Sequence, residues 1–191
     1  MEAFLRALLP RLLPRDRTFE VHAFQCKSDL LGKLEARLRG YAAWLPADWR
    51  IVVVVDRDDD DCRDLKRQLE AVSERAGLRR RTRAGNAQWQ LVNRIAIEEL
   101  EAWYFGDWEA VHAAFPRVPV TVPQRRGFRD PDAIAGGTWE AFERVLQRHG
   151  YFKGGLNKID AARAIGAHIA PERARSHSFA VFCEAIAESA A

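Results

Sequence analysis

Cysteine is scarce in this sequence of 191 residues, with only three, far apart and without a Cys-x-x-Cys pair. Disulfide frameworks and structural zinc sites require paired or clustered cysteines, so neither is expected. Long apolar runs are lacking as well, because none approaches the roughly 20 residues that cross a bilayer. The amino-terminal residues do not show the charged, apolar and cleavage regions of a signal peptide. We therefore expect a cytoplasmic protein with no membrane partner.

Several familiar catalytic signatures are missing too. The five histidines show no His-Glu-x-x-His spacing. The chain also has no Gly-x-Ser-x-Gly elbow, no Gly-x-x-x-x-Gly-Lys phosphate loop and no Gly-x-Gly-x-x-Gly fingerprint. These absences argue against an ordinary hydrolase, an intrinsic nucleoside triphosphatase and a dinucleotide-dependent enzyme. The net charge of +3 is too small to indicate nucleic-acid binding by itself.

The clearest element that is present is a strand over residues 50–55. Five consecutive β-branched residues, Ile51 to Val55, show no alternation with polar residues. Such a strand is covered on both faces, as in parallel sheets, so we expect it at the centre of a sheet. Alternating or β-rich segments predict three further strands: residues 18–25, and residues 78–83 and 88–95, the last two joined as a hairpin by residues 84–87.

The rest of the chain shows helical spacing of apolar residues. Helices are expected at residues 1–13, 28–44, 60–76, from 97 onward, 108–115, 138–149, 156–168 and 178–189. Strand signals stop at residue 107, and a long proline- and glycine-rich loop covers residues 116–137. The predicted fold class is therefore α/β, with a core over residues 1–106 and a helical extension over residues 107–191 packed on it.

An acidic run directly follows the central strand. Asp56 and Asp58 are alternate residues at its carboxyl end, where open parallel sheets place their ligand sites. If the strand geometry continues, both carboxylates face the same side, and clustered carboxylate oxygens suit Mg²⁺. They are the candidate metal ligands. The alternative is capping or a solvated surface, since Asp59, Asp60 or Asp61 can cap the next helix.

A second acidic group follows the last predicted strand, where Glu98, Glu99 and Glu101 precede Trp103. Another strand end can approach the same cleft there. On a helix Glu98 and Glu101 share a face, which makes them the better pair, although the spacing does not choose among the three. They are candidates for a metal ligand or a general base. The alternative is that first-turn glutamates only stabilise the helix dipole.

Basic residues form the candidate contacts to phosphate. Flexible glycines next to ammonium groups can hold phosphate, although Gly154 and Gly155 can also be a simple connector. In the same way, Ser176 or Ser178 can be a helix cap. The candidate phosphate or nucleic-acid contacts are Arg79, Arg80, Arg81, Arg83, Lys153 and Lys158.

Together, the Asp-x-Asp at residues 56–58 and the Glu-Glu-x-Glu-Ala-Trp segment at residues 98–103 resemble a bacterial family of Toprim-related proteins of unknown function. The resemblance spans nearly the whole chain. Toprim domains of topoisomerases, primases and overcoming-lysogenization-defect nucleases bind Mg²⁺ for phosphoryl transfer. They use a glutamate after their first strand and an Asp-x-Asp after a later one. The resemblance implies a Toprim-like, mostly parallel sheet, with Asp56 and Asp58 as the Asp-x-Asp pair.

One part of that pattern is missing. Relatives commonly have an apolar strand and Val-Glu-Gly-x-Ser-Glu before a helix like residues 2–9, whereas Met1 stands where that helix begins. Either the start codon was assigned too late, or the protein lacks one strand and one carboxylate. In-frame DNA upstream of the start codon would distinguish the two.

The leading functional prediction is a metal-dependent phosphoryl-transfer protein, a nuclease that acts on DNA or RNA with Mg²⁺ or Mn²⁺. The alternative is a noncatalytic Toprim-like subunit that binds an ATPase in a defence or repair complex. A structural oligomer with an acidic loop, such as a homodimer, is the third reading. These alternatives differ in their response to metal, which the sequence does not reveal.

Overall fold

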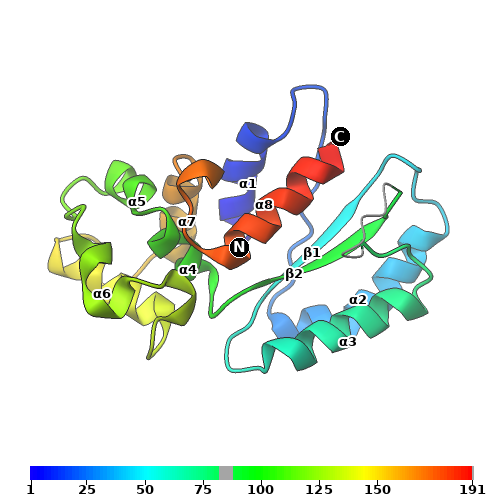
Figure 1. Cartoon of the computed structure of the whole chain (residues 1–191), viewed down its shortest axis with the longest axis horizontal. Helices are drawn as coiled ribbons and strands as arrows, with labels where there is room; N and C mark the ends of the chain where they lie inside the picture. Colours follow the sequence, from blue (N-terminus) through cyan, green and yellow to red (C-terminus); the bar gives the residue numbers. More distant parts are fainter. Residues whose placement is uncertain (82–87, 191) are drawn as a thin grey trace.

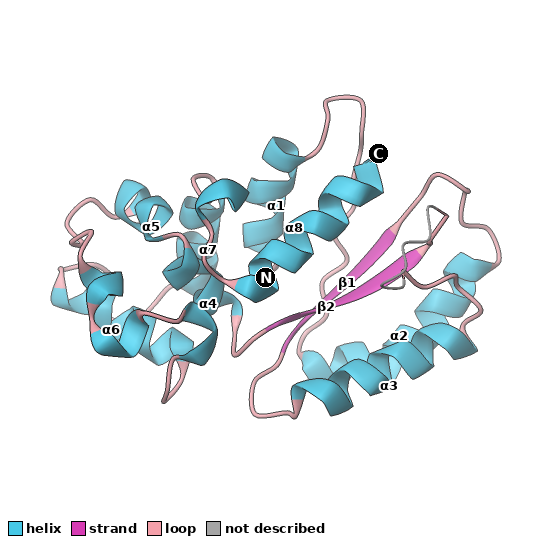
Figure 2. Ribbon diagram, viewed as in Figure 1, coloured by secondary structure: helices cyan, strands magenta, loops and turns pink. Residues whose placement is uncertain are grey.

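The computed structural model of the chain describes residues 1–81 and 88–190, and Figures 1 and 2 show its arrangement. The strands are β1 (Ile51–Asp56) and β2 (Leu91–Ala96). The helices are α1 (Glu2–Leu12), α2 (Lys27–Ala42), α3 (Cys62–Arg75), α4 (Leu100–Gly106), α5 (Trp108–Ala114), α6 (Thr138–Arg148), α7 (Lys158–Gly166) and α8 (His177–Ala190), with 3-10 turns at Val122–Gln124, Arg126–Phe128, Pro131–Ala133 and Pro171–Arg173. None of the helices in the described part of the chain has the length and apolar character needed to cross a membrane.

The two strands form a parallel sheet, so the fold is mixed α/β as predicted. They pair in register from Ile51 opposite Leu91 to Asp56 opposite Ala96. Side chains alternate across the sheet, and the two faces of β1 therefore meet different helices. Val53 and Val55 pack in an apolar cluster with α2 and α3, while Val52 and Val54 pack against the cluster that contains α1 and α8. The prediction that this strand is covered on both faces is confirmed, but its predicted place at the centre of a sheet is wrong, because β1 pairs with a strand on one edge only among the described residues.

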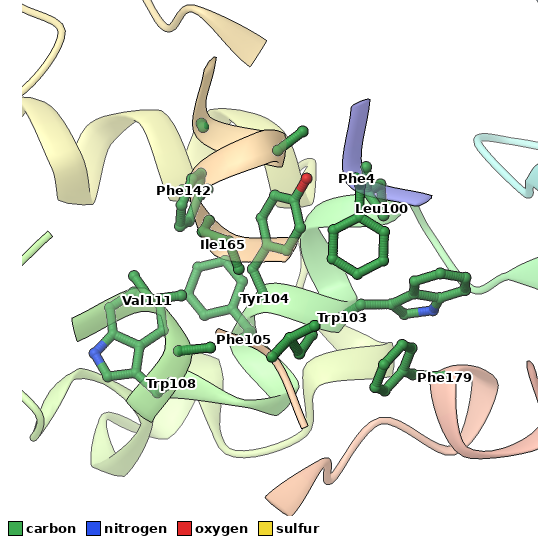
Figure 3. Close-up of a cluster of buried hydrophobic side chains, with 14 of the residues drawn as sticks. Phe4, Leu100, Trp103, Tyr104, Phe105, Trp108, Val111, Phe142, Ile165 and Phe179 are labelled. Carbon is green, nitrogen blue, oxygen red and sulfur yellow. The ribbon is translucent and has the colours of Figure 1, made fainter. Parts of the chain in front are cut away.

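The larger core lies among the helices and is rich in aromatic rings (Figure 3). Trp103 and Phe182 stack with ring centroids 5.1 Å apart, and Phe105 stacks on Trp108 at 5.2 Å. Helices α1 and α7 cross closely in this core, because a Cβ added at Gly166 would lie only 2.8 Å from the carbonyl oxygen of Phe4. The amino-terminal helix is therefore packed with the carboxyl-terminal helices, and α8 lies against β2 (Figure 1).

Two of the predicted strands are not strands within the residues that the structure describes. Residues 18–25 form an extended segment that pairs with no strand among the described residues. In the segment over residues 78–83, Arg80 makes a single bridge to Leu91, and that bridge is parallel, whereas a hairpin requires antiparallel pairing. Residues 82–87, which include the predicted connection, lie outside the described residues. An alternating pattern predicts an extended chain, but it does not supply the neighbour with which a strand must pair.

Most predicted helices are confirmed to within a few residues, and local chemistry explains their ends. Asp61 caps α3, since its carboxylate accepts hydrogen bonds from the backbone N–H groups of Arg63 and Asp64 at 2.9 and 3.0 Å. Gly77 follows α3 with φ +77°, a conformation that glycine adopts without strain. The helix expected from residue 97 instead begins at Leu100, because Glu98 has a positive φ of 62°.

Candidate functional site

The carboxyl ends of β1 and β2 define the candidate site. Asp56 is the last residue of β1 and lies opposite Ala96, the last residue of β2. The chain that leaves β2 runs through Glu98 and Glu99 into α4, which carries Glu101. Parallel pairing thus brings two acidic segments, far apart in the sequence, to one edge of the sheet.

Asp56 carries the least satisfied carboxylate of this group. Its Oδ1 atom is buried and has no hydrogen-bond partner among the described residues. The pKa of Asp56 is raised to about 6, mainly by burial. The amino group of Met1 and the ammonium of Lys158 oppose this shift, and the neighbouring carboxylates of Asp58 and Glu99 add to it. A carboxylate in this setting favours either a proton or a bound cation.

Glu101 is the second buried acid, with only 6% of its surface exposed. Burial raises its pKa to about 7, Lys158 opposes this shift, and the carboxylates of Glu99 and Asp56 add to it. Three residues later in α4, the hydroxyl of Tyr104 is buried without a hydrogen-bond partner among the described residues (Figure 3). Burial and the nearby Glu101 and Asp56 raise the pKa of Tyr104 well above 10. These three side chains form a polar group that contains two buried oxygen atoms without partners among the described residues.

Asp58 does not share the position of Asp56. The strand ends at Asp56, and Asp58 has φ 49°, so the alternation expected from strand geometry does not continue. The carboxylate of Asp58 lies 2.8 Å from the ammonium of Lys27, which also pairs with Asp60 at 2.7 Å. The charge of Asp58 is therefore compensated by a residue of α2, although it lies near enough to raise the pKa of Asp56.

The three glutamates have different partners. Glu98 forms an ion pair with Arg57. Glu99 accepts hydrogen bonds from the hydroxyl of Thr138 at 2.8 Å and the backbone N–H of Trp139 at 2.9 Å. Because α4 begins at Leu100, the shared helical face expected for Glu98 and Glu101 does not exist. Glu99 instead raises the pKa of Asp56, and Glu99 and Asp56 both raise the pKa of Glu101.

The arginine cluster lies at the other end of the sheet. Arg80 bridges Leu91, the first residue of β2, about 16 Å from the Asp56 end at roughly 3.3 Å per residue. The side chain of Arg80 pairs with Glu70 at 3.1 Å, and that of Arg81 pairs with Glu188 at 2.5 Å. Arg79 donates to the carbonyl oxygen of Gln88 at 2.9 Å. The structure does not bring these residues to the acidic site, and Arg83 lies outside the described residues.

Of the two candidate lysines, Lys158 is the one near the acids. It is the first residue of α7, its Nζ atom lies 4.1 Å from the ring centroid of Trp139, and its charge opposes the raised pKa values of Asp56 and Glu101. Lys153 is exposed in the turn before α7. Sequence reasoning missed Tyr104 and Lys27. The three-residue spacing from Glu101 could have indicated Tyr104, whereas only the tertiary structure brings Lys27 to Asp58.

The acids at this site do not form a closed metal cage. Among the described residues, no three His, Cys, Asp or Glu side chains are grouped so that they could hold a metal ion. Mg²⁺, however, commonly binds through one or two carboxylates and completes its shell with water and phosphate oxygens. The unpartnered Oδ1 of Asp56, next to the acids of α4, provides such a reduced donor set.

Comparison with known proteins identifies a family but no characterised relative. A family model described as "Domain of unknown function (DUF4276)" matches residues 1–187, so the chain belongs to this family. No curated protein and no solved structure matches the chain. The resemblance to Toprim domains stays a prediction.

Proposed function

We propose that this member of the DUF4276 family is a metal-dependent phosphoryl-transfer enzyme, a nuclease that acts on DNA or RNA. Asp56 would hold the Mg²⁺ or Mn²⁺ ion through its unpartnered Oδ1 atom, and water and phosphate oxygens would supply the other ligands. One observation carries the proposal: a carboxylate with a buried, unpartnered oxygen lies beside a second, fully buried acid at the carboxyl end of parallel strands.

The electrostatics of the acids support a cation ligand. Burial without a paired cation raises the pKa of Asp56 to about 6 and of Glu101 to about 7. Carboxylates with a raised pKa occur more often at catalytic centres than elsewhere, because catalysis uses groups that readily bind a cation or transfer a proton. A bound Mg²⁺ or Mn²⁺ would polarise a phosphate oxygen and offset the charge that develops on it.

The other residues of the site have separate roles in this proposal. Glu101, with a pKa of about 7, is matched to accept a proton from an attacking water near neutral pH. Lys158 would contact the phosphate, since its exposed ammonium lies near both acids. Asp58 is not assigned as a metal ligand, because Lys27 already pairs with it. Glu99 fixes the start of α6 through Thr138.

Cleavage assays on plasmid DNA, single-stranded DNA and RNA test this function. The wild-type chain should cleave at least one of these in Mg²⁺ or Mn²⁺ and not in EDTA. Asp56→Asn should lower the rate at least about 100-fold, the effect of removing one charge-stabilising group. Asp59→Asn is the matched control, since Asp59 is an exposed acid of the same loop, and it should cleave at the wild-type rate. Equal rates for Asp56→Asn and Asp59→Asn would contradict the assignment.

A second candidate is a noncatalytic subunit, for example one that binds an ATPase in a defence or repair complex. The observation that favours it is the outer edge of β1, which pairs with no strand among the described residues. This candidate predicts that saturating Mn²⁺ leaves the melting temperature of the wild-type chain unchanged. The proposed enzyme function predicts that saturating Mn²⁺ raises the melting temperature of the wild type and of Asp59→Asn, and leaves that of Asp56→Asn unchanged.

A further inference from the structure

The side-chain ammonium of Lys27 is surrounded by three oxygen atoms of the loop that follows β1. Its Nζ atom lies 2.8 Å from the carboxylate of Asp58 and 2.7 Å from that of Asp60. It also donates a hydrogen bond to the carbonyl oxygen of Arg57 at 2.8 Å. An ammonium group has three N–H donors, so each donor of Lys27 has one acceptor in this loop. Lys27 itself begins α2 and therefore joins the loop to a different helix.

These oxygen atoms form the kind of position that also binds a metal ion. Carboxylate and backbone carbonyl oxygens are the usual ligands of hard divalent cations such as Mg²⁺. The ammonium of Lys27 stands in for such a cation here, with only 21% of its side chain exposed. Burial acts to lower the pKa of Lys27, but the hydrogen bonds to Asp58 and Asp60 outweigh it, and the pKa is raised. The positive charge is therefore retained at neutral pH.

The backbone of the loop is held in an unusual conformation beside this ammonium. Asp58 has φ 49°, a left-handed conformation that is uncommon for residues other than glycine. Its N–H donates to the carbonyl oxygen of Glu98 at 2.9 Å, and Arg57 forms an ion pair with the carboxylate of Glu98. Such conformations persist where several contacts hold them, and they are concentrated at functional sites. Lys27 provides further contacts of this kind and so holds the loop that directly follows Asp56.

Asp56 has the opposite environment. Its Oδ1 atom is buried and lacks a hydrogen-bond partner among the described residues, whereas the carboxylates of Asp58 and Asp60 both contact Lys27. The charge of Asp58 nevertheless raises the pKa of Asp56, so the two positions are close enough to interact. The end of β1 thus carries two neighbouring acidic positions, and Lys27 supplies a cation to only one of them.

We propose that the ammonium of Lys27 is a built-in cation, which occupies a metal position beside Asp56 and excludes a divalent ion from Asp58 and Asp60. A divalent ion at these oxygens would lie in contact with the ammonium and be repelled by it. The inference rests on the proposed function and deepens it. Two-metal sites hold their ions about 3.5–4 Å apart, whereas this nuclease would use a single divalent ion, at Asp56, and the ammonium in place of the second. Lys27 is then a positioning residue that fixes the loop next to the metal ligand.

Counting bound Mn²⁺ ions by isothermal titration calorimetry tests the proposal. The wild-type chain should bind one ion. Lys27→Met nearly keeps the length of the side chain and removes its charge, which frees the three oxygens around it, so this variant should bind two ions. Lys27→Arg retains a positive charge and should bind one. Lys33→Met is the matched control, since Lys33 lies in the same helix but pairs with Asp29, and it should also bind one.

The variant Asp56→Asn separates this inference from the proposed function. Asp56→Asn alone should bind no Mn²⁺, and the double variant Asp56→Asn, Lys27→Met should bind one ion at the freed oxygens. A wild-type chain that binds no ion, beside a Lys27→Met chain that binds one, would contradict the proposed metal site and still support Lys27 as a built-in cation. One ion in both chains would support the metal site and contradict the inference about Lys27.

Two ions in the wild-type chain would also overturn the proposal, because the ammonium would then exclude nothing. This measurement requires no variant. If Lys27→Met does not fold, Lys27→Gln replaces it, since its amide can still donate to the carbonyl oxygen of Arg57. Lys27→Gln should bind the second ion too, and a count equal to that of the wild type would contradict the proposal.

Discussion

The aromatic core among the helices and the outer edge of β1 differ in how completely their groups are satisfied. In the core, the indole nitrogens of Trp103 and Trp108 have partners, at Ser178 and the carbonyl oxygen of Pro119, whereas the hydroxyl of Tyr104 has none among the described residues. Backbone N–H groups alternate in direction along a strand, so at the strand edge those of Val52, Val54 and Asp56 point away from β2 and face a large open groove lined by residues of α1 and α2. We therefore expect most of the stability to come from the helical core, while the unpaired backbone donors lie at the sheet, where both the candidate site and the groove lie.

The largest expected effect concerns the aromatic core. Phe142 is fully buried against Tyr104 and Phe105, so Phe142→Ala should lower the free energy of unfolding by about 3–5 kcal/mol. Trp44 follows the end of α2 and is 58% exposed. Trp44→Ala should cost less than about 1 kcal/mol. Urea denaturation of both variants measures the difference, and similar losses would remove the contrast between the two regions.

A smaller effect compares two ion pairs. Asp107 is 2% exposed, lies 2.8 Å from an Arg173 nitrogen and also accepts from the N–H of Ala170. Asp107→Asn should cost about 2 kcal/mol, since the cation that remains is partly exposed. Glu188 and Arg81, at the sheet, form a more exposed pair. Glu188→Gln should cost about 0.5 kcal/mol. Thermal unfolding at low ionic strength separates the two, and a larger cost for Glu188→Gln would contradict the comparison.

The raised pKa values of Asp56 and Glu101, at the carboxyl end of the sheet, predict that the protein loses stability as the pH rises. The folded pKa values of Asp56 and Glu101, about 6 and about 7, exceed the ordinary values of 3.8 and 4.5. The folded chain then holds more protons than the unfolded chain, and the stabilisation is complete below about pH 4 and disappears as the pH rises through 6 and 7.

Melting temperatures at about pH 5 and about pH 7.5 measure this dependence. The double variant Asp56→Asn, Glu101→Gln should lose most of the fall between the two, whereas Asp59→Asn should retain it. A double variant with the wild-type fall would show that other groups cause it. Mg²⁺ should reduce the fall in the wild-type chain if the proposed cation site exists.

The smallest effect leaves stability unchanged and probes two thiols. Cys183 lies in α8 against the aromatic core, and burial raises its pKa to about 12. Cys26 is exposed beside the groove, and a hydrogen bond with Ser28 lowers its pKa. Iodoacetamide at about pH 8 should modify Cys26 at least about 100-fold faster, as mass spectrometry of each site would measure. Comparable rates would indicate that α8 opens readily from the core.

The sequence predicted the backbone better than the site. The β-branched run identified β1 and its two covered faces. Gly77 marked the end of α3, and the cap at its start was narrowed to Asp59, Asp60 or Asp61, of which the structure uses Asp61. Local patterns succeed here because a few neighbouring residues determine these preferences. The strand over residues 18–25 was wrong, because pairing depends on a partner that no local pattern supplies.

The site shows the same division. Asp56 was predicted from its position after β1, but its equivalence with Asp58 was wrong, since the strand ends and the backbone turns to a positive φ. The prediction that Glu98 and Glu101 share a helical face was also wrong. It assumed a helix that includes Glu98, whereas α4 begins at Leu100. Both errors extended a regular geometry beyond the residue where it stops.

The sequence by itself determined that this protein has an apolar parallel strand followed by carboxylates, and that helices make up its carboxyl-terminal half. Only the tertiary structure decided which carboxylates are buried, that Lys27 neutralises Asp58, and that the outer edge of β1 faces a groove. The physical reason is the distance along the chain between the residues that determine each property. Backbone preference depends on adjacent residues, whereas burial, pKa and edge pairing depend on segments that meet only when the chain folds.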